Sequence, residues 1–224
     1  MASQFDLLEF FALLAPAERG VFERAAAVMT VARQDPVITQ DTPGGDVYFV
    51  IDGRLEVAVS SDRGRNVFYR TLVPGDVFGE LAAIDGRPRT ATVTTSSNAT
   101  LVRLSAADFR RILEASHPAA MWLVRRHTAQ IRTLTARLFE QVAHDVVTRV
   151  RMELIRLAEA AGVKDNRALV AAFDTHQHLA EKLGTTREAV TRELNELQAK
   201  GLILKNRREL TVLDYDGLKK LLTV

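Results

Sequence analysis

Arg187, Glu188 and Arg192 stand close together within residues 174–201, and their side chains suit hydrogen bonding to the edges of DNA bases. An arginine can donate two hydrogen bonds to guanine O6 and N7, and a carboxylate can accept one from cytosine N4. On a helix, Thr191 would share the same outward face. These residues predict a surface that reads G·C-containing half-sites. The alternative is an ordinary surface helix, whose opposite charges support one another at helical spacing.

A second group with binding chemistry lies within residues 73–93. Gly79 permits a close approach of the backbone to a ligand, and Arg89 offers the forked donors that bind a phosphate. Leu81 is expected to begin a short helix whose free N–H groups attract an anion. Glu80 cannot bind a phosphate, but it can accept a hydrogen bond from a sugar hydroxyl. The segment predicts a phosphate site. The alternative is an internal Glu80–Arg89 ion pair that bridges two turns of the protein, with no ligand in the pocket.

The composition of the 224-residue chain excludes several other kinds of chemistry. With no cysteine there can be no disulfide, thiolate zinc site, cysteine-ligated iron–sulfur cluster or cysteine nucleophile. The histidines all lie outside the β-rich part of the sequence, so we expect no metal-sensing or haem-sensing site. Residues 73–93 lack a cluster of metal-binding carboxylates and an activated nucleophile, so we do not expect an enzyme.

The sequence predicts no interaction with a membrane. Its apolar stretches are interrupted by charges well short of a spanning length, and the N-terminus lacks the basic start of a secretory signal. We therefore expect a cytoplasmic protein. The net charge of +2 neither demands nor forbids a nucleic acid partner, so the local placement of charge must decide.

Two short helices around Gly184 are expected to position the base-reading side chains. Their inner faces are apolar at helical spacing, with Leu179 and Leu183 on the first and Val190, Leu194 and Leu197 on the second. Thr185 can cap the second helix with Glu188 as the reciprocal acceptor, and Gly201 can end it. The pattern predicts a helix-turn-helix.

A β-hairpin is expected after these helices. Two β-prone runs, Leu202–Leu204 and Leu210–Leu213, flank a basic turn that contains Lys205, Arg207 and Arg208. These cations could neutralise DNA phosphates, which contributes affinity but no choice of sequence. A solvated turn would look similar alone, so the prediction of a DNA-binding wing depends on the neighbouring helix pair.

The phosphate site needs a different scaffold. Residues 35–104 consist of short runs rich in Val, Ile, Phe, Tyr and Thr, separated by turns such as Gly44-Gly45, Asp52-Gly53 and Arg63-Gly64. Such regular spacing predicts an antiparallel barrel or jelly roll that can enclose a pocket.

Residues 105–161 are expected to form a long helix, because no Gly or Pro occurs between Ala119 and Ala161. Val124, Ile131 and Leu138 recur every seven residues, the repeat of a two-stranded coiled coil. Intermediate positions are filled by Thr128, Leu134, Thr135 and Val142. The stripe could instead pack on the chain's own roll. We favour a homodimer, because reading a palindrome requires a two-fold partner.

Taken together, these segments resemble the cyclic-AMP receptor protein / FNR family of bacterial regulators over nearly the whole chain. The motif F-G-E-L at Phe78–Leu81, with P-R-T-A at Pro88–Ala91, is similar to the phosphate-binding cassette of that family. The resemblance implies an α+β fold with three parts. These are a cyclic-nucleotide-binding β-roll (jelly roll) at 1–115, a long dimerisation helix at 116–144 and a C-terminal winged helix-turn-helix at 145–224.

The resemblance also implies the ligand contacts. Glu80 would bind the ribose 2′-hydroxyl, and Arg89 and Thr90 would bind the cyclic phosphate. Backbone amides of Gly79, Leu81 and Ala91 would assist, and Leu134 and Thr135 fall where the family contacts the base. The implied effector is cyclic AMP. Cyclic GMP is the alternative, because Thr90 and the spacing from Glu80 to Arg89 also resemble kinase domains that prefer it. A constitutive member with an empty pocket remains a further alternative.

For DNA, the pattern R-E-x-x-x-R resembles the receptor-protein branch, which reads TGTGA-like half-sites. The implied contacts come from the two helices and the wing, at Thr175, Gln177, Thr186, Arg187, Glu188, Thr191, Arg192, Lys205, Arg207 and Arg208. The Asp145-Val146 pair resembles the family's hinge. The resemblance further implies a homodimeric transcription factor, with RNA polymerase as a partner and residues 163–167 as the surface that meets it.

Overall fold

The computed structural model describes residues 5, 7–60, 66–206 and 208–222. Contacts divide the chain into two compact units, Met1–Ile131 and Arg132–Val224. Helix α5 (His117–Ala143) runs through the boundary between these units. The turn expected at Arg63-Gly64 lies outside the described residues.

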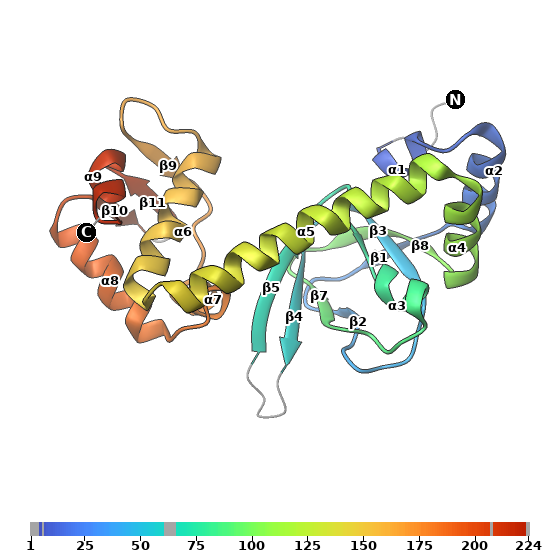
Figure 1. The fold of residues 1–224 in the computed structure, drawn as a ribbon, viewed down its shortest axis with the longest axis horizontal. Coiled ribbons are helices and arrows are strands. Elements are labelled where there is room, and N and C mark those ends of the chain that lie inside the picture. Colours follow the sequence, from blue (N-terminus) through green and yellow to red (C-terminus); the bar gives the residue numbers. More distant parts are fainter. Residues whose placement is uncertain (1–4, 6, 61–65, 207, 223–224) are drawn as a thin grey trace. The chain divides into compact units, whose positions relative to one another are not determined.

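The first unit contains two four-stranded antiparallel sheets, in the strand orders β1-β8-β3-β6 and β2-β7-β4-β5 (Figure 1). The predicted antiparallel roll is therefore confirmed. Its strands are β1 (Ala27–Val31), β2 (Pro36–Ile38), β3 (Val47–Asp52), β4 (Leu55–Ser60), β5 (Asn66–Leu72), β6 (Val77–Phe78), β7 (Thr92–Thr95) and β8 (Ala99–Leu104). Its further helices are α1 (Glu9–Ala12), α2 (Pro16–Ala25), α3 (Glu80–Asp85) and α4 (Ala106–Ala115).

Strand β3 separates two apolar cores. Its side chains alternate in direction, so Tyr48 and Val50 enter the core between the sheets, while Phe49 enters a second core under the helices. That alternation explains why four successive residues of β3 are buried. The second core is rich in aromatic rings, and Phe10 lies 5.0 Å from Phe49 and 5.3 Å from Trp122 between ring centroids. Trp122 thereby anchors the first turns of α5 to the roll.

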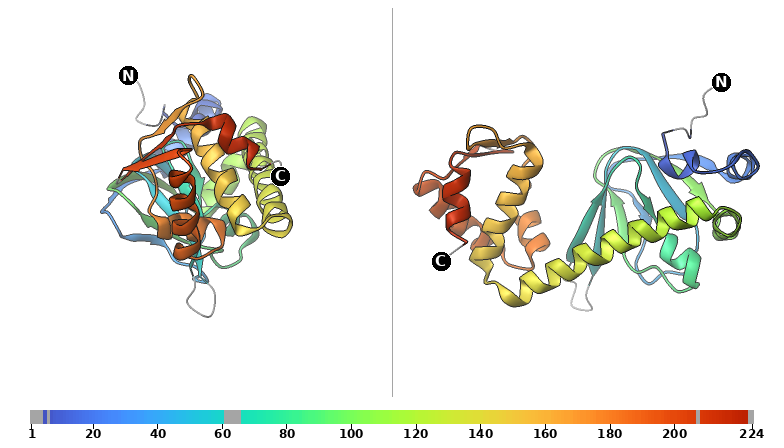
Figure 2. Two further views of the ribbon diagram at one scale, coloured as in Figure 1. Left: turned by 90° about the vertical axis from the view of Figure 1, so that its left-hand side faces the viewer. Right: turned by 45° about the horizontal axis from the view of Figure 1, so that its top comes forward.

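The second unit combines helices with a three-stranded antiparallel sheet in the order β10-β11-β9. Helix α6 packs against β9, α8 and α9 (Figure 2). The elements after α5 are α6 (Val146–Ala161), β9 (Ala168–Val170), α7 (His176–Leu183), α8 (Arg187–Ala199), β10 (Ile203–Asn206), β11 (Glu209–Val212) and α9 (Tyr215–Lys220). The five leucine and valine residues predicted to join α7 to α8 are all buried, which confirms the helix-turn-helix.

The single long helix expected over residues 105–161 is wrong in one respect, because the structure breaks it into α4, α5 and α6. Ser116 has an extended backbone, and its hydroxyl accepts a hydrogen bond from the Ala119 amide at 3.4 Å. Asp145 is also extended, and its carboxylate caps α6 by accepting from the Thr148 amide at 2.8 Å. At Asp145 a capping side chain thus marks a helix boundary where neither Gly nor Pro occurs, whereas the break at Ser116 lies two residues before Pro118.

Two boundaries in the second unit also differ from expectation. Thr186, not Thr185, caps α8, since its hydroxyl accepts from the Ala189 amide at 3.3 Å. The hairpin strands are shifted relative to the predicted runs and occupy Ile203–Asn206 and Glu209–Val212. Gly184 adopts the left-handed conformation at the end of α7, as the predicted turn requires.

Candidate ligand site and DNA-reading surface

Arg89 is the centre of the candidate ligand site. The residue is 5% exposed, and its guanidinium donates to the Gly79 carbonyl and to the Asp46 carbonyl, each at 2.8 Å. The backbone of Arg89 is held as well, because its amide donates to the Thr42 carbonyl at 3.0 Å. The loop between β2 and β3 and the start of α3 therefore fix this cation in place.

Gly79 is required at its position for two reasons. Its φ angle of 82° lies in the left-handed region, which L side chains rarely adopt. A Cβ atom there would also lie 2.7 Å from Arg89 Nη1 and 2.7 Å from the Asp46 carbonyl oxygen. The glycine predicted to allow a close backbone approach thus allows the approach of Arg89 itself.

A cavity of about 370 Å³ opens beside Arg89. Its other lining residues come from β2, β3 and the loop between them, namely Val37, Ile38, Thr39, Thr42, Pro43, Gly44, Gly45, Asp46 and Tyr48. Burial raises the pKa of the Tyr48 phenol and the Asp46 charge adds to this rise, so the hydroxyl stays protonated and can donate. From the sequence, this loop is predicted only as a turn. Its Thr-Pro-Gly-Gly composition was the signal that could have marked a ligand-facing loop.

Glu80 lies at the N-terminus of α3, and its side chain contacts a histidine of α5. Its Oε1 lies 3.1 Å from Nε2 of His127 on α5, and the two side chains are 9% and 27% exposed. Within the described residues no ion pair joins Glu80 to Arg89. The alternative of an internal Glu80–Arg89 ion pair is therefore not observed, because the arginine donates to backbone carbonyls instead.

The remaining predicted ligand residues have mixed environments. Leu81 is 40% exposed on α3, and the neighbouring Thr90 is exposed after Arg89. Ala91 is buried in the core between the sheets. Leu134 and Thr135 lie on α5 within the second unit, and both are exposed.

Polar contacts between α5 and the rest of the first unit follow one face of the helix. The Trp122 indole donates to Glu9 Oε2 at 2.8 Å, Arg126 binds the Asp76 carboxylate, and Gln130 donates to the Tyr69 hydroxyl. His127 adds its contact with Glu80 to this series. None of these polar contacts is predicted from the sequence, because heptad spacing identifies apolar positions only.

The residues predicted to read DNA bases lie together on one surface. Arg187, Glu188, Thr191, Arg192 and Asn195 together line one open surface along α8. The first of these lies directly after the Thr186 cap, so the group occupies the first turns of the helix. Helix-turn-helix proteins read bases with those turns.

The residues predicted to contact phosphates lie on α7 and on the hairpin that follows α8. Thr175 caps α7 by accepting from the His178 amide at 3.2 Å, and Gln177 is exposed on the same helix. Lys205 lies on β10 and Arg208 is exposed in the following turn. Arg207 lies outside the described residues.

His176 connects three elements of the DNA-reading unit. Its Nδ1 lies 2.7 Å from the Thr191 hydroxyl on α8, and its Nε2 contacts the Lys205 amine on β10. The Thr191 hydroxyl in turn donates to the Arg187 carbonyl at 2.8 Å. A neutral imidazole with the proton on Nδ1 satisfies both contacts, because it donates to Thr191 and accepts from Lys205.

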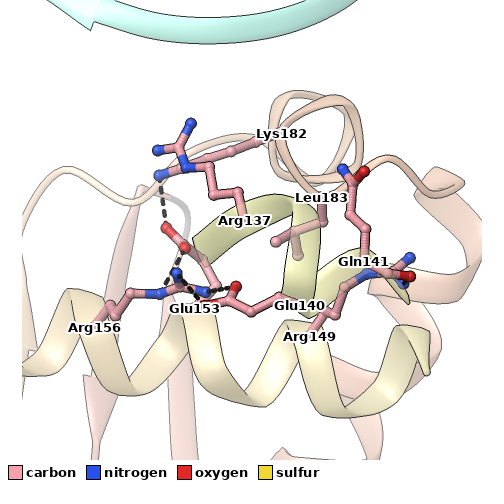
Figure 3. Close-up of a pocket in the computed structure, with 8 residues that line it drawn as sticks. All are labelled: Arg137, Glu140, Gln141, Arg149, Glu153, Arg156, Lys182 and Leu183. Atoms are coloured by element: carbon pink, nitrogen blue, oxygen red, sulfur yellow. Dashed lines mark hydrogen bonds and ion pairs between the residues drawn. The ribbon is translucent and has the colours of Figure 1, made fainter. Parts of the chain in front are cut away.

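A network of charges joins the end of α5 to α6 and α7 within the second unit (Figure 3). Arg156 binds both carboxylate oxygens of Glu140, at 3.2 and 2.9 Å, and lies 3.4 Å from Glu153. Glu153 is 6% exposed and also pairs with Lys182 at 2.6 Å. Arg149 donates to the His144 carbonyl at 2.9 Å, just beyond the end of α5. Five side chains therefore connect the end of α5 with α6 and α7.

Two family models match the chain. Residues 28–116 match the cyclic nucleotide-binding domain, and residues 148–221 match the Crp-like helix-turn-helix domain. The chain belongs to the CRP/FNR family. This CRP/FNR regulator is 26% identical over 189 residues to a CRP-like cAMP-activated global transcriptional regulator of Mycobacterium tuberculosis, which covers 84% of each chain. It is 25% identical over 158 residues to the cAMP-activated global transcriptional regulator CRP of Haemophilus influenzae, which covers 70% of each.

Solved structures support the same fold. A CooA mutant from Carboxydothermus hydrogenoformans aligns with a TM-score of 0.80 at 20% identity, covering 98% of this chain and 99% of that one. A transcriptional regulator of the crp/fnr family from Eubacterium rectale aligns with a TM-score of 0.75 at 19% identity, covering 98% and 100%. The predicted α+β fold is therefore confirmed. The CRP/FNR chain is a DNA-binding, cyclic-nucleotide-binding transcription regulator and not an enzyme.

The described residues contain neither a membrane-spanning helix nor a cluster of metal-binding side chains. None of the helices there is long and apolar enough to cross a membrane. In the same residues, no group of three or more His, Cys, Asp or Glu side chains is placed to hold a metal ion.

His176 predicts a pH dependence in this CRP/FNR regulator. Burial lowers the pKa of His176 below its ordinary value of 6.5, and the charges of Lys205 and Arg187 lower it further. The unfolded chain therefore binds the proton first as the pH falls. The contribution of neutral His176 to the free energy of unfolding should be fully present above about pH 6.5. Below that pH this contribution should decrease, as the pH falls through the folded pKa.

Urea unfolding between pH 7.5 and 5.5 measures this effect. His176→Gln should flatten the dependence, because glutamine keeps a polar side chain that does not titrate in this range. The carboxylate of Asp174, whose pKa the His178 hydrogen bond lowers from 3.8, titrates below the range. Parallel pH profiles for the wild type and the variant would contradict the assignment to His176.

Proposed function

We propose that this chain is a homodimeric transcription factor that a cyclic nucleotide switches to its DNA-binding state, with cyclic AMP as the effector. The observation that carries the proposal is the Arg89 guanidinium. This buried cation borders a cavity of about 370 Å³, and within the described residues it has carbonyl partners but no carboxylate partner. Carbonyl oxygens leave its charge uncompensated, and an anionic phosphate would supply the missing charge.

Of the ligand residues that the family resemblance implies, Arg89 lines the cavity, and the others are assigned by the resemblance. Arg89 and Thr90 would bind the cyclic phosphate, and Glu80 would accept the ribose hydroxyl. Amides of Gly79, Leu81 and Ala91 would assist, and Leu134 and Thr135 on α5 would face the base. On this proposal residues 1–115 bind the nucleotide, 116–144 form the dimer and 145–224 bind DNA.

The exposed stripe on α5 supports the dimer. The side chains of Val124, Ile131 and Leu138 are 52%, 62% and 64% exposed, and Val142 is 82% exposed. A continuous stripe of this kind at heptad spacing is typical of a coiled-coil partner surface. In a two-fold dimer the two α8 helices would enter successive major grooves, about 34 Å apart, at a palindromic TGTGA-like operator. The nucleotide would act by shifting the population toward that arrangement.

Calorimetric titration of the full chain with cyclic AMP and cyclic GMP, paired with operator binding in the presence of each, tests the proposal. We expect cyclic AMP to bind more tightly and to increase operator affinity. Tighter binding of cyclic GMP, with an increase in operator affinity, would support the same mechanism with a different effector, since Thr90 suits either nucleotide. Absence of binding by both nucleotides would contradict the proposal.

A constitutive regulator, or one with a different effector, is the second candidate. It is favoured by Leu134, which stands where the family has a hydroxyl, and by the carbonyls that already satisfy Arg89. Structures with this fold include CprK complexed with OCPA and the c-di-GMP responsive regulator CLP of Xanthomonas campestris. Operator affinity that does not change with either cyclic nucleotide would favour this candidate.

The proposal places the regulator in the cytoplasm with DNA and RNA polymerase. The loop over residues 163–167 would meet the polymerase. Its Lys164 and Arg167 close a short bridge through two backbone hydrogen bonds, at 2.8 and 2.9 Å, before β9.

A further inference from the structure

The Glu80 carboxylate is buried, and among the described residues only one of its two oxygens has a hydrogen-bond partner. The residue is 7% exposed, and Oε1 contacts His127 Nε2 at 3.1 Å. Within the described part of the chain, Oε2 has no hydrogen-bond partner, yet it is not enclosed away from solvent. An imidazole thus holds one oxygen of this side chain while the other stays available to an incoming donor.

The imidazole comes from a helix that is itself held firmly. His127 follows Arg126, which binds the Asp76 carboxylate, and precedes by one turn Gln130, which binds the Tyr69 hydroxyl. Arg126 also stacks over the Trp122 ring, with its guanidinium carbon 4.9 Å from the ring centroid. Within this row, His127 is the residue whose partner belongs to the candidate ligand site. Its position is therefore fixed independently of Glu80.

We propose that His127 is a positioning residue for the sugar of the effector. It holds Oε1 of Glu80 so that Oε2 accepts the ribose 2′-hydroxyl. The inference rests on the proposed function. It assigns to His127 on α5 an effect on affinity that depends on the ribose 2′-hydroxyl of the ligand. A glutamate side chain held in one rotamer loses less conformational entropy when it binds the hydroxyl, and so binds it more tightly.

The test compares two nucleotides on matched variants of the full chain. His127→Leu removes the hydrogen bond and leaves an apolar side chain in its place. His127→Gln restores a hydrogen-bond donor near the position of Nε2. His117→Leu is the control, because this histidine is exposed at the start of the same helix. The ligands are cyclic AMP and 2′-deoxy cyclic AMP, measured by calorimetry, with thermal denaturation to establish that each variant is folded.

We expect His127→Leu to weaken cyclic AMP binding about tenfold, the effect of one hydrogen bond to a charged group. Binding of 2′-deoxy cyclic AMP should change by less than about twofold, since that ligand does not offer the hydroxyl. His127→Gln should recover most of the affinity, and His117→Leu should leave both ligands unaffected.

Equal losses for the two ligands, or a folded His127→Gln protein that binds cyclic AMP no better than His127→Leu, would overturn the role of His127. Those outcomes would leave the proposed function intact, because the wild type would still bind the nucleotide. A wild-type protein that binds neither nucleotide would instead overturn the proposed function and this role with it.

Discussion

Replacing Arg89 with alanine is expected to weaken cyclic nucleotide binding by roughly 30-fold to several thousand-fold. Removal of one partner from a buried, hydrogen-bonded charge pair costs about 2–5 kcal/mol, and each 1.4 kcal/mol corresponds to about a tenfold change in affinity. The substitution would leave the ligand phosphate with no cation in the site. Calorimetry with cyclic AMP measures the loss directly.

Arg103→Ala is the matched control. This arginine also interacts with Asp46, but its ion pair is 3.6 Å long and its side chain is 51% exposed. Exposed pairs of this kind contribute about 0–1 kcal/mol, so its removal should change nucleotide affinity little. Arg89→Lys keeps the charge without the fork and should bind with intermediate affinity. Nucleotide affinity that survives Arg89→Ala in a folded protein would show that the ligand site has been placed wrongly.

Loss of Arg192 is expected to relax the choice of base at one operator position, at a cost of about 1–3 kcal/mol on the preferred sequence. Arg192 shares the open surface of α8 with Arg187 and Glu188, which is where base edges would be read. Binding of Arg192→Ala to operators that carry each of the four bases at every half-site position measures the effect. The preference should disappear at a single guanine and persist elsewhere.

Arg208→Ala provides the contrast. Arg208 is exposed in the turn of the wing, where it can reach a phosphate but is not part of the α8 surface. Its loss should weaken binding to all sequences alike and lower the dependence of affinity on salt by about one phosphate contact. A uniform loss from Arg192→Ala would identify that arginine as a phosphate contact as well.

The sequence predicted the DNA-reading unit well because its signals are local. Leu179 and Val190 lie at helical spacing, and the left-handed Gly184 between the two helices marks the turn. The cap was misplaced by one residue, since adjacent threonines at 185 and 186 offer the same hydroxyl. Only the backbone conformation distinguishes them, and Thr186 has the extended one.

The ligand site was predicted less completely, because its contacts join distant parts of the chain. The Asp46 carbonyl that binds Arg89 is a backbone atom 43 residues away, and no residue type marks such an acceptor. His127 lies 47 residues from Glu80. Spacing along a helix does not show which distant part of the chain one of its faces contacts.

The charge network at the bend has a consequence for how operator binding responds to dissolved salt. Glu153 is 6% exposed and lies between Lys182 and Arg156. Ions in solution screen buried pairs far less than exposed ones. Potassium chloride should therefore leave the Glu153–Lys182 contact between α6 and α7 intact over the usual experimental range. The slope of DNA affinity against salt concentration would then report the number of phosphates that the protein neutralises. Loosening of the contact between α6 and α7 would not contribute to that slope.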